Sequence, residues 1–296
     1  MNLLDGFEIA RPLERGVWDV DEKTYRADAA VNFHTLADFQ RDPRAFEEGY
    51  FEKRDAADAM RFGTACHSAL LEGPSAFARD VAVFSPPVNA KTGEAFGATT
   101  KTFLDARNAF ETANAGKTII STTDAAAIEQ LERSFLFHPV APRVMRGGWG
   151  RPEIAIKGEM IVDGEPVVVK GRLDWYGPAG LTDFKSTARL DDASGRQRFK
   201  YAIYDYKYLV QLGFYHRLLT DVCGAPFVPA QIVAGEREAP HRIAVYAFTR
   251  EIVEDARNVA LEWLRRYVDA KKRGYYPSPF DQIQIIDKYN PEKDLM

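Results

Sequence analysis

Residues 153–186 constrain the fold of this 296-residue chain more than any other stretch. From Glu153 to Val162 the apolar residues Ile154, Ile156, Met160 and Val162 fall at even positions, which is the pattern of a strand with one buried face. Asp163-Gly164 is a strong signal for a two-residue hairpin turn, and a valine-rich run follows it. Gly177-Pro178-Ala179-Gly180 then turns the chain into Leu181–Ser186. The sequence therefore predicts an antiparallel meander of three strands.

The two turns also predict how the three strands align. If Asp163 and Gly164 form the first loop, Glu153 lies opposite Asp174. If residues 177–180 form the second loop, Asp174 lies opposite Asp183, and the three acids form one row with neighbours about 5 Å apart. Lys185 falls on the same face as Asp183, because side chains alternate along a strand. A single β-bulge in the first hairpin would displace Glu153 from this row.

A row of acids is a costly arrangement in a sheet, because like charges opposite one another destabilise it unless cations neutralise them. Carboxylate oxygens favour Mg²⁺, with Mn²⁺ as a substitute, and a lysine beside such an ion suits phosphodiester chemistry. A surface cluster of ion pairs is the alternative. The pattern Asp-x-Lys is weak by itself, since it occurs at Asp21, Asp183, Asp205 and Asp269. Only the pair at Asp183 follows a partner acid on an expected strand.

The rest of the chain predicts helices around this meander and a mixed α/β fold in a single domain over residues 1–296. We expect an N-terminal extension over 1–30, the core over 31–276 and an irregular tail over 277–296. Residues 85–100 read as an exposed loop, and a strand is expected at 242–249. Helices are expected on both sides of Asp42-Pro43 and at 55–72, 101–115, 123–137, 201–222 and 250–273.

Composition sets limits on the compartment and the partner. No apolar run is long enough to span a membrane, the N-terminus does not read as a signal peptide, and two cysteines suggest reduced thiols in a cytoplasmic protein. The net charge of −4 argues mildly against nucleic acid. The stretch from residue 185 to 217 is nevertheless basic and could hold phosphates, although a solvated charged face explains it equally well. Its cations are Lys185, Arg189, Arg196, Arg198, Lys200, Lys207 and Arg217, against the acids Asp191, Asp192 and Asp205.

Five motifs together resemble a known family of nucleases. They are Gly63-Thr64-Ala65-Cys66-His67, Glu153, Gly171-Arg172-Leu173-Asp174, Asp183-Phe184-Lys185-Ser186-Thr187 and Gln211-x-x-x-Tyr215. In order and spacing the chain is similar to the RecB-like branch of the PD-(D/E)XK nucleases over about residues 30–280. The run Tyr204-Asp205-Tyr206 strengthens the likeness to the RecE (exonuclease VIII) group of phage-type exonucleases. Aspartate stands at position 183 where other relatives use glutamate, and the cysteine quartet of the iron–sulfur cousins is missing.

The resemblance implies a restriction-endonuclease-like core, in which helices flank a central mixed sheet, and it implies roles for single residues. Asp174 and Asp183 would bind the metal with the Phe184 carbonyl. Glu153 and His67 would also be metal ligands, and Lys185 would position or activate the attacking water. Gln211 and Tyr215 would contact the nucleic acid, and Arg172 and Lys207 are further candidates for such contacts that the resemblance does not itself supply.

Each assignment has an ordinary structural alternative. His67 lies among apolar residues, where a packed core histidine is the common case. Gln211 and Tyr215 could simply edge an amphipathic helix, and Arg172 could hold a carboxylate instead of a phosphate.

The function implied is a Mg²⁺-dependent exodeoxyribonuclease acting on double-stranded DNA ends. By family likeness it would degrade one strand from the 5′ end and leave 3′ single-stranded tails for an annealing protein or recombinase, in a homo-oligomer. An endonuclease or repair nuclease of the same fold is a second hypothesis, and a non-catalytic DNA-binding module is a third. A nucleotide-driven motor is disfavoured, because the chain has no Gly-x-x-x-x-Gly-Lys-Ser/Thr loop.

Overall fold

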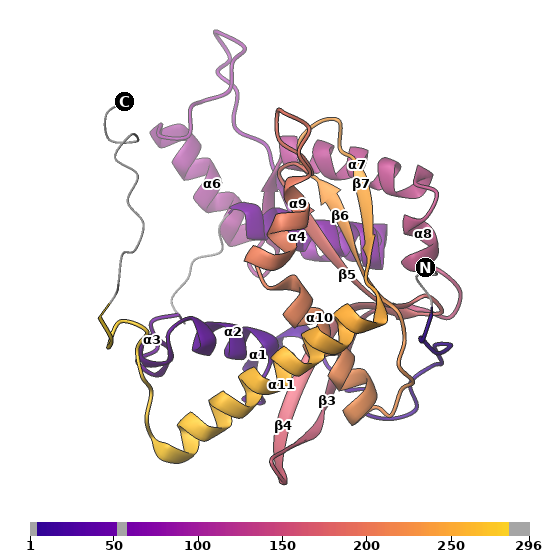
Figure 1. The fold of residues 1–296 in the computed structure, drawn as a ribbon. Helices are drawn as coiled ribbons and strands as arrows, with labels where there is room; N and C mark the ends of the chain where they lie inside the picture. Colours follow the sequence, from indigo (N-terminus) through magenta and orange to yellow (C-terminus); the bar gives the residue numbers. More distant parts are fainter. Residues whose placement is uncertain (1–4, 52–57, 284–296) are drawn as a thin grey trace, which may run out of the picture.

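A five-stranded mixed sheet forms the centre of the protein (Figure 1). The computed structural model describes residues 5–51 and 58–283. The strand order is β3-β4-β5-β6-β7, in which only β5 and β6 run parallel. The strands are β3 (Arg151–Val162), β4 (Glu165–Gly177), β5 (Gly180–Thr187), β6 (Ala230–Glu236) and β7 (Ile243–Ala247). The predicted antiparallel meander is confirmed as β3-β4-β5.

Helices cover both faces of this sheet. Ile232 and Ala234 of β6 pack in the larger core with α10 and α11, whereas Val233 faces the second core with α4 and α7. The helices are α1 (Glu22–Ala27), α2 (Phe33–Arg41), α3 (Pro43–Glu47), α4 (Asp58–His67), α5 (Pro74–Asp80), α6 (Lys101–Ala113), α7 (Thr122–Phe137), α8 (Ala141–Val144), α9 (Arg198–Asp205), α10 (Tyr208–Arg217) and α11 (Arg250–Arg273). Single π-helical turns, Ser68–Glu72 and Leu218–Val222, continue α4 and α10. The predicted fold class, a mixed α/β restriction-endonuclease-like core, is confirmed.

The turns set the register as predicted. In β3 and β4, Pro152 pairs with Trp175 and Val162 with Glu165 around the Asp163-Gly164 turn. The second turn is tighter than expected, because the ladder closes on Gly177 and Gly180 and leaves only Pro178 and Ala179 in the loop. This keeps the predicted alignment, since the shorter loop is centred on the same point.

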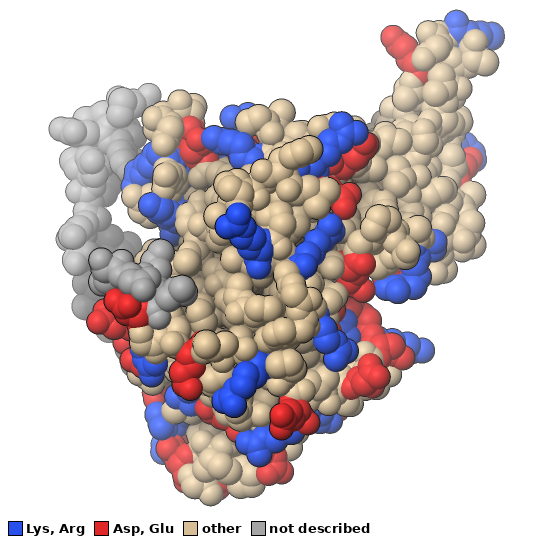
Figure 2. All heavy atoms as spheres, turned by 90° about the vertical axis from the view of Figure 1, so that its right-hand side faces the viewer, with Lys and Arg blue, Asp and Glu red and all other residues tan. Residues whose placement is uncertain are grey.

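Three strands were not predicted from the sequence. β6 is buried at every position, so it shows none of the alternation that reveals a half-buried strand. The short strands β1 (Val81–Phe84) and β2 (Thr118–Ser121) form a separate parallel pair. Between them, residues 85–100 form an exposed arm that projects from the body beside α6 (Figures 1 and 2).

The expected helix at 201–222 begins earlier and breaks in the middle. Lys207 adopts a left-handed conformation with φ 59°, and this residue separates α9 from α10. The expected helix at 55–72 is described from Asp58 onward, and its first three residues lie outside the described ranges. Of the predicted irregular tail, residues 284–296 likewise lie outside them. Among the described residues, no helix combines the length and apolar character needed to cross a bilayer.

Candidate metal and active site

His67 reaches the sheet from the last turn of α4, which packs tightly on β5. A Cβ added to Gly63, one turn earlier, would lie 3.3 Å from Ser186 Oγ, so the glycine permits this close approach. Ala65 and Cys66 are fully buried and fix the helix orientation. The His67 ring then packs edge-on against Phe184, with ring centroids 5.6 Å apart. The histidine thus lies directly over the strand that carries Asp183 and Lys185.

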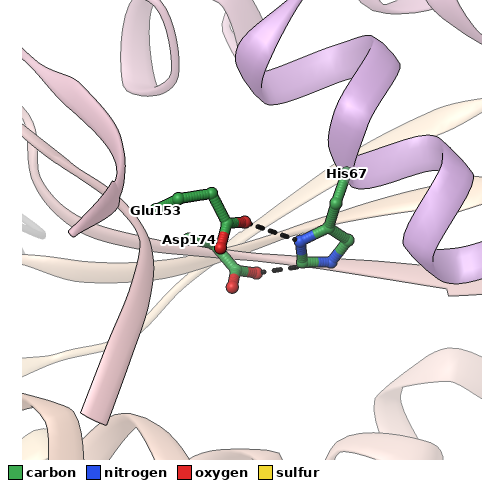
Figure 3. A group of neighbouring side chains, drawn as sticks. All are labelled: His67, Glu153 and Asp174. Carbon is green, nitrogen blue, oxygen red and sulfur yellow. Dashed lines mark hydrogen bonds and ion pairs between the residues drawn. The ribbon is translucent and has the colours of Figure 1, made fainter. Parts of the chain in front are cut away.

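Three predicted ligands converge at this point (Figure 3). His67 Nδ1 lies 3.2 Å from Glu153 Oε1, and His67 Nε2 lies 3.7 Å from Asp174 Oδ2. One potential ligand atom from each of the three residues lies within 4.8 Å of the others. The residues come from α4, β3 and β4, so the cluster forms only when the helix and the sheet meet.

Glu153 takes part through an unusual backbone conformation. Its φ is 50°, and the ladder between β3 and β4 skips the pair Glu153–Asp174 while keeping the same register on both sides. No residue is inserted, so this is not the bulge considered from the sequence. The expected row of side chains is thus interrupted at Glu153, whose carboxylate instead turns toward His67.

Asp174 lies where β4 and β5 separate. The paired part of the two strands ends at Trp175 and Thr182, one step before the expected pair of Asp174 with Asp183. Asp174 Oδ2 accepts a hydrogen bond from the Phe184 N–H at 2.7 Å. The carboxylate therefore replaces a ladder hydrogen bond, and the second predicted pair of acids lies beside the ladder instead of within it.

The buried Asp183 pairs with the partly buried Lys185 next to this cluster. Lys185 Nζ lies 2.6 Å from Asp183 Oδ2, which confirms that the two side chains share a face. Asp183 is 1% exposed; its Oδ2 contacts the Lys185 ammonium, whereas its Oδ1 has no hydrogen-bond partner in the described part of the chain. A buried carboxylate with unused acceptor capacity is costly unless a cation lies near it. Lys185 neutralises part of this charge, and the unpartnered Oδ1 is the feature of the site that best fits a metal ion.

The close spacing of the acids shifts the pKa values of the site residues. Burial raises the pKa of Asp174, and burial together with Asp174 raises the pKa of Asp183 to about 6, against the opposing effect of Lys185. Burial alone would lower the pKa of His67, but the Asp174 and Glu153 carboxylates outweigh it and raise that pKa to about 9. The same balance, with Asp183 and Asp174 as the acids, raises the pKa of Lys185. The site therefore favours added positive charge.

Arg172 lies beside the cluster but is already engaged. Its Nη1 donates to Glu22 of α1, its guanidinium carbon lies 4.8 Å from the centre of the Tyr25 ring, and its Nε is 4.0 Å from Glu153 Oε2. This matches the carboxylate-binding alternative for Arg172, and Nε still has no hydrogen-bond partner among the residues described. A phosphate contact for Arg172 stays a prediction.

Gln211 and Tyr215 are buried next to the site. Gln211 Nε2 donates to Tyr215 Oη at 3.0 Å, and both residues are less than 9% exposed. Burial raises the pKa of Tyr215 well above its ordinary value, and the nearby Asp174 carboxylate adds to this effect. Lys207, in contrast, is exposed at the junction of α9 and α10. The nucleic-acid contacts expected of these three residues remain predictions.

Tyr208 is a neighbour of the site that the sequence reading missed. The Lys185 ammonium lies 5.0 Å from the centre of its ring. The sequence did contain a signal, because Tyr208 lies two residues after the noted Tyr204-Asp205-Tyr206 run. Its contact with Lys185 depends on the left-handed turn at Lys207, which periodicity does not reveal.

The donor set suits a hard divalent cation. Glu153 and Asp174 supply carboxylate oxygens and His67 a ring nitrogen, and the neighbouring Asp183 has an unpartnered Oδ1 with capacity for a ligand bond. Oxygen-rich sites of this kind fit Mg²⁺ or Mn²⁺ better than a thiolate-preferring metal. The binding of a divalent metal is thus consistent with the residues present.

Comparison with known proteins supports the fold. A crystal structure of a protein from Eubacterium rectale, described as a candidate exonuclease, is similar with a TM-score of 0.58 and 13% identity, over 94% of this chain and 98% of the other. The structure of SSO0001 is 16% identical over 59% of this chain and 73% of the other, and its TM-score of 0.27 is too low to support an argument. No curated protein matches the chain in sequence.

The family assignment comes from the sequence model that covers most of the chain. Residues 33–289 match a PDDEXK-like domain, and this span contains every residue of the candidate site. The predicted membership of the PD-(D/E)XK superfamily is thereby confirmed. The chain belongs to the family of the PDDEXK-like domain of unknown function (DUF3799).

Proposed function

We propose that the protein is a Mg²⁺-dependent exodeoxyribonuclease that hydrolyses phosphodiester bonds at duplex DNA ends. One observation carries this proposal: the buried Asp183 carboxylate, paired with Lys185 through one oxygen only, lies next to the converging side chains of His67, Glu153 and Asp174. Buried acids that repel one another in their ionised forms are stabilised by a nearby cation, and a metal ion would add to the effect of Lys185. The PDDEXK-like family assignment agrees with a nuclease built on these residues.

Each residue of the site has a proposed role that follows from its chemistry. Asp174, Asp183, Glu153 and His67, with the Phe184 carbonyl, would hold the metal. When bound, such an ion lowers the pKa of a water molecule and neutralises charge on the phosphate. Lys185, which contacts the Asp183 carboxylate, would position the attacking water and stabilise the negative charge that develops on the phosphoryl oxygens. Gln211 and Tyr215 would position Asp174 from the side of α10.

The choice of an exonuclease over an endonuclease rests on the resemblance of this chain to other proteins. The motifs resemble those of the RecE group, and the E. rectale neighbour is described as a candidate exonuclease. We therefore infer attack from the 5′ end, which leaves 3′ tails for an annealing protein or recombinase in the cytoplasm. A homo-oligomer belongs to the same proposal. An endonuclease of this fold is the competing outcome.

The test uses linear duplex DNA labelled separately at its 5′ and 3′ ends, with Mg²⁺, Mn²⁺ or EDTA, and a closed circular duplex. We expect release of the 5′ label from linear DNA with either metal, and no cutting of circles. Cutting of circles would instead favour the endonuclease. Asp183→Ala and Lys185→Ala should each reduce hydrolysis by about 10²-fold or more.

The chain offers a matched control for these variants. Asp269 and Lys271 repeat the Asp-x-Lys pattern on the outer surface of α11, where Asp269 pairs with Arg273. Asp269→Ala and Lys271→Ala should leave hydrolysis unchanged. Full activity of a pure, folded Asp183→Ala protein would rule out the proposed site.

A further inference from the structure

Four tyrosines gather on one short segment beside the candidate site. Tyr201 and Tyr204 on α9 and Tyr206 after it are 51%, 61% and 67% exposed, and Tyr208 at the start of α10 is half-buried. The opposite side of α9 is anchored by Phe199 and Ile203, which are buried in the core. The exposed rings are therefore held on a fixed scaffold and are not needed to attach it.

A chain of ring contacts leads from this segment to Lys185. The Lys185 ammonium lies 5.0 Å from the centre of the Tyr208 ring, and the Tyr208 and Tyr206 ring centres are 5.7 Å apart with planes at 30°. Tyr208 also packs against Phe199, with centres 6.2 Å apart. The exposed Tyr206 is thus separated from the proposed catalytic lysine by one side chain. A strand whose phosphate lies at Lys185 would have its next nucleotides near these rings.

The same segment carries cations that are free of ion pairs. Arg198, Lys200 and Lys207 are exposed, and none of them forms a salt bridge in the part of the chain that the structure describes. On the face shown in Figure 2, basic and acidic side chains are mixed without a large area of one sign. A protein of net charge −4 with mixed surfaces needs local sites to hold a polyanion. Exposed cations interleaved with exposed rings form such a local site, in which Arg198, Lys200 and Lys207 outnumber the exposed acid Asp205.

We propose that Tyr204 and Tyr206, with Lys200 and Lys207, bind unpaired nucleotides of a DNA strand next to the cleavage site. Aromatic side chains stack on the faces of bases in single strands, and adjacent cations hold the backbone. In an intact duplex those faces are covered by neighbouring base pairs, so the surface selects an unpaired end. The biological meaning of this site rests on the proposed nuclease function, but the binding itself can be measured without hydrolysis.

The experiment measures binding of a short fluorescent oligothymidylate by anisotropy in EDTA, where hydrolysis is suppressed. The double variant Tyr204→Ala/Tyr206→Ala should weaken binding about tenfold or more, because stacking contributes substantially at each base. The double variant Tyr204→Phe/Tyr206→Phe keeps the rings and should bind as the wild type does. Tyr275→Ala removes a ring of similar exposure, 63%, beyond the end of α11 and should also leave binding unchanged.

The outcomes separate this proposal from the nuclease proposal. Unchanged affinity in the double alanine variant would overturn the nucleotide site, as would an equal loss in the phenylalanine variant, since the rings would then not be responsible. Ring-dependent binding by a protein that hydrolyses no DNA with Mg²⁺ or Mn²⁺ would uphold the nucleotide site and overturn the nuclease. Because the rings are exposed, thermal melts of the variants should match the wild type.

Discussion

At the scale of single residues, His216 shows how burial fixes a protonation state. It is fully buried in α10, where its Nε2 lies 3.0 Å from the Val228 carbonyl and its Nδ1 lies 2.9 Å from Arg257 Nη1. An arginine can only donate, so Nδ1 must be the unprotonated acceptor and Nε2–H the donor. Burial, reinforced by the Arg257 charge, lowers the pKa of His216 to about 4. A proton added here would break the arginine contact and place two cations together.

This histidine predicts a pH dependence of stability. Above pH 6.5, the ordinary pKa of the group, it is neutral in both the folded and the unfolded chain. Between pH 6.5 and pH 4, His216 is protonated in the unfolded chain but stays neutral in the native protein. The free energy of unfolding therefore falls as the pH falls through this range. The loss should be about 3 kcal/mol across this window, at roughly 1.4 kcal/mol per unit.

Urea denaturation at pH 7.5 and pH 5 measures this effect in the wild type and in His216→Gln. The glutamine can still accept from Arg257 but does not titrate. The wild type should therefore lose about 2 kcal/mol more than the variant between these two values. Equal losses would show that His216 does not carry the pH dependence.

At the scale of elements, α10 and α11 depend on a glycine for their close packing. A Cβ added to Gly213 would lie 2.3 Å from the backbone carbon of Ala256 and 2.4 Å from its oxygen. These are backbone atoms of a helix, which cannot yield as the end of a flexible side chain does. The two helices also share a hydrogen bond from Arg217 Nε to the Arg257 carbonyl at 2.8 Å.

Gly213→Ala should therefore separate α10 from α11 and lower the free energy of unfolding by about 2–3 kcal/mol. Chemical denaturation is the measurement. Gly97→Ala is the matched control, because a Cβ there meets no atom within 4 Å and the change should stay within about 0.5 kcal/mol. Equal stability of the two variants would contradict the packing argument.

The elements also show what local patterns can predict. The Asp163-Gly164 turn and the period-2 pattern gave the register of β3 and β4, and the amphipathic pattern gave α11 with its observed bounds. β6 was missed because a central strand buried on both faces has no alternation. The break at Lys207 was missed because a left-handed lysine leaves no signature in helical periodicity.

At the scale of the whole molecule, the candidate site should couple metal binding to stability. The acids Glu153, Asp174 and Asp183 lie on separate strands, and their mutual repulsion opposes folding until a cation neutralises it. A cation that binds only the folded protein adds about 2.7 kcal/mol at a concentration 100 times its Kd. For a chain of this length that corresponds to a rise in Tm of about 5 °C.

Thermal melts of the wild type in EDTA and in Mg²⁺ test this coupling. Asp174→Asn should abolish most of the Mg²⁺-dependent rise, because it removes one ligand charge. The same variant should melt no lower than the wild type in EDTA, since it also removes repulsion. A rise of equal size in both proteins would place the metal elsewhere.

The candidate site was predictable to the extent that its residues are neighbours in sequence. Lys185 was assigned correctly to the face of Asp183, because side chains two residues apart on a strand point to the same side of the sheet. His67 was included only through the resemblance of its motif, since it comes from a helix 86 positions before Glu153. The expected division into extension, core and tail stays a prediction.

By itself the sequence determined the meander, its register and the helical segments, because turn chemistry and hydrogen-bond periodicity act over a few residues. The tertiary structure decided the rest. Packing of α4 on β5 brought His67 to the acids, the left-handed backbone of Glu153 turned its carboxylate toward that ring, and the turn at Lys207 placed Tyr208 on Lys185. These are contacts between distant segments, and their energies depend on burial and mutual fit, which no local pattern encodes.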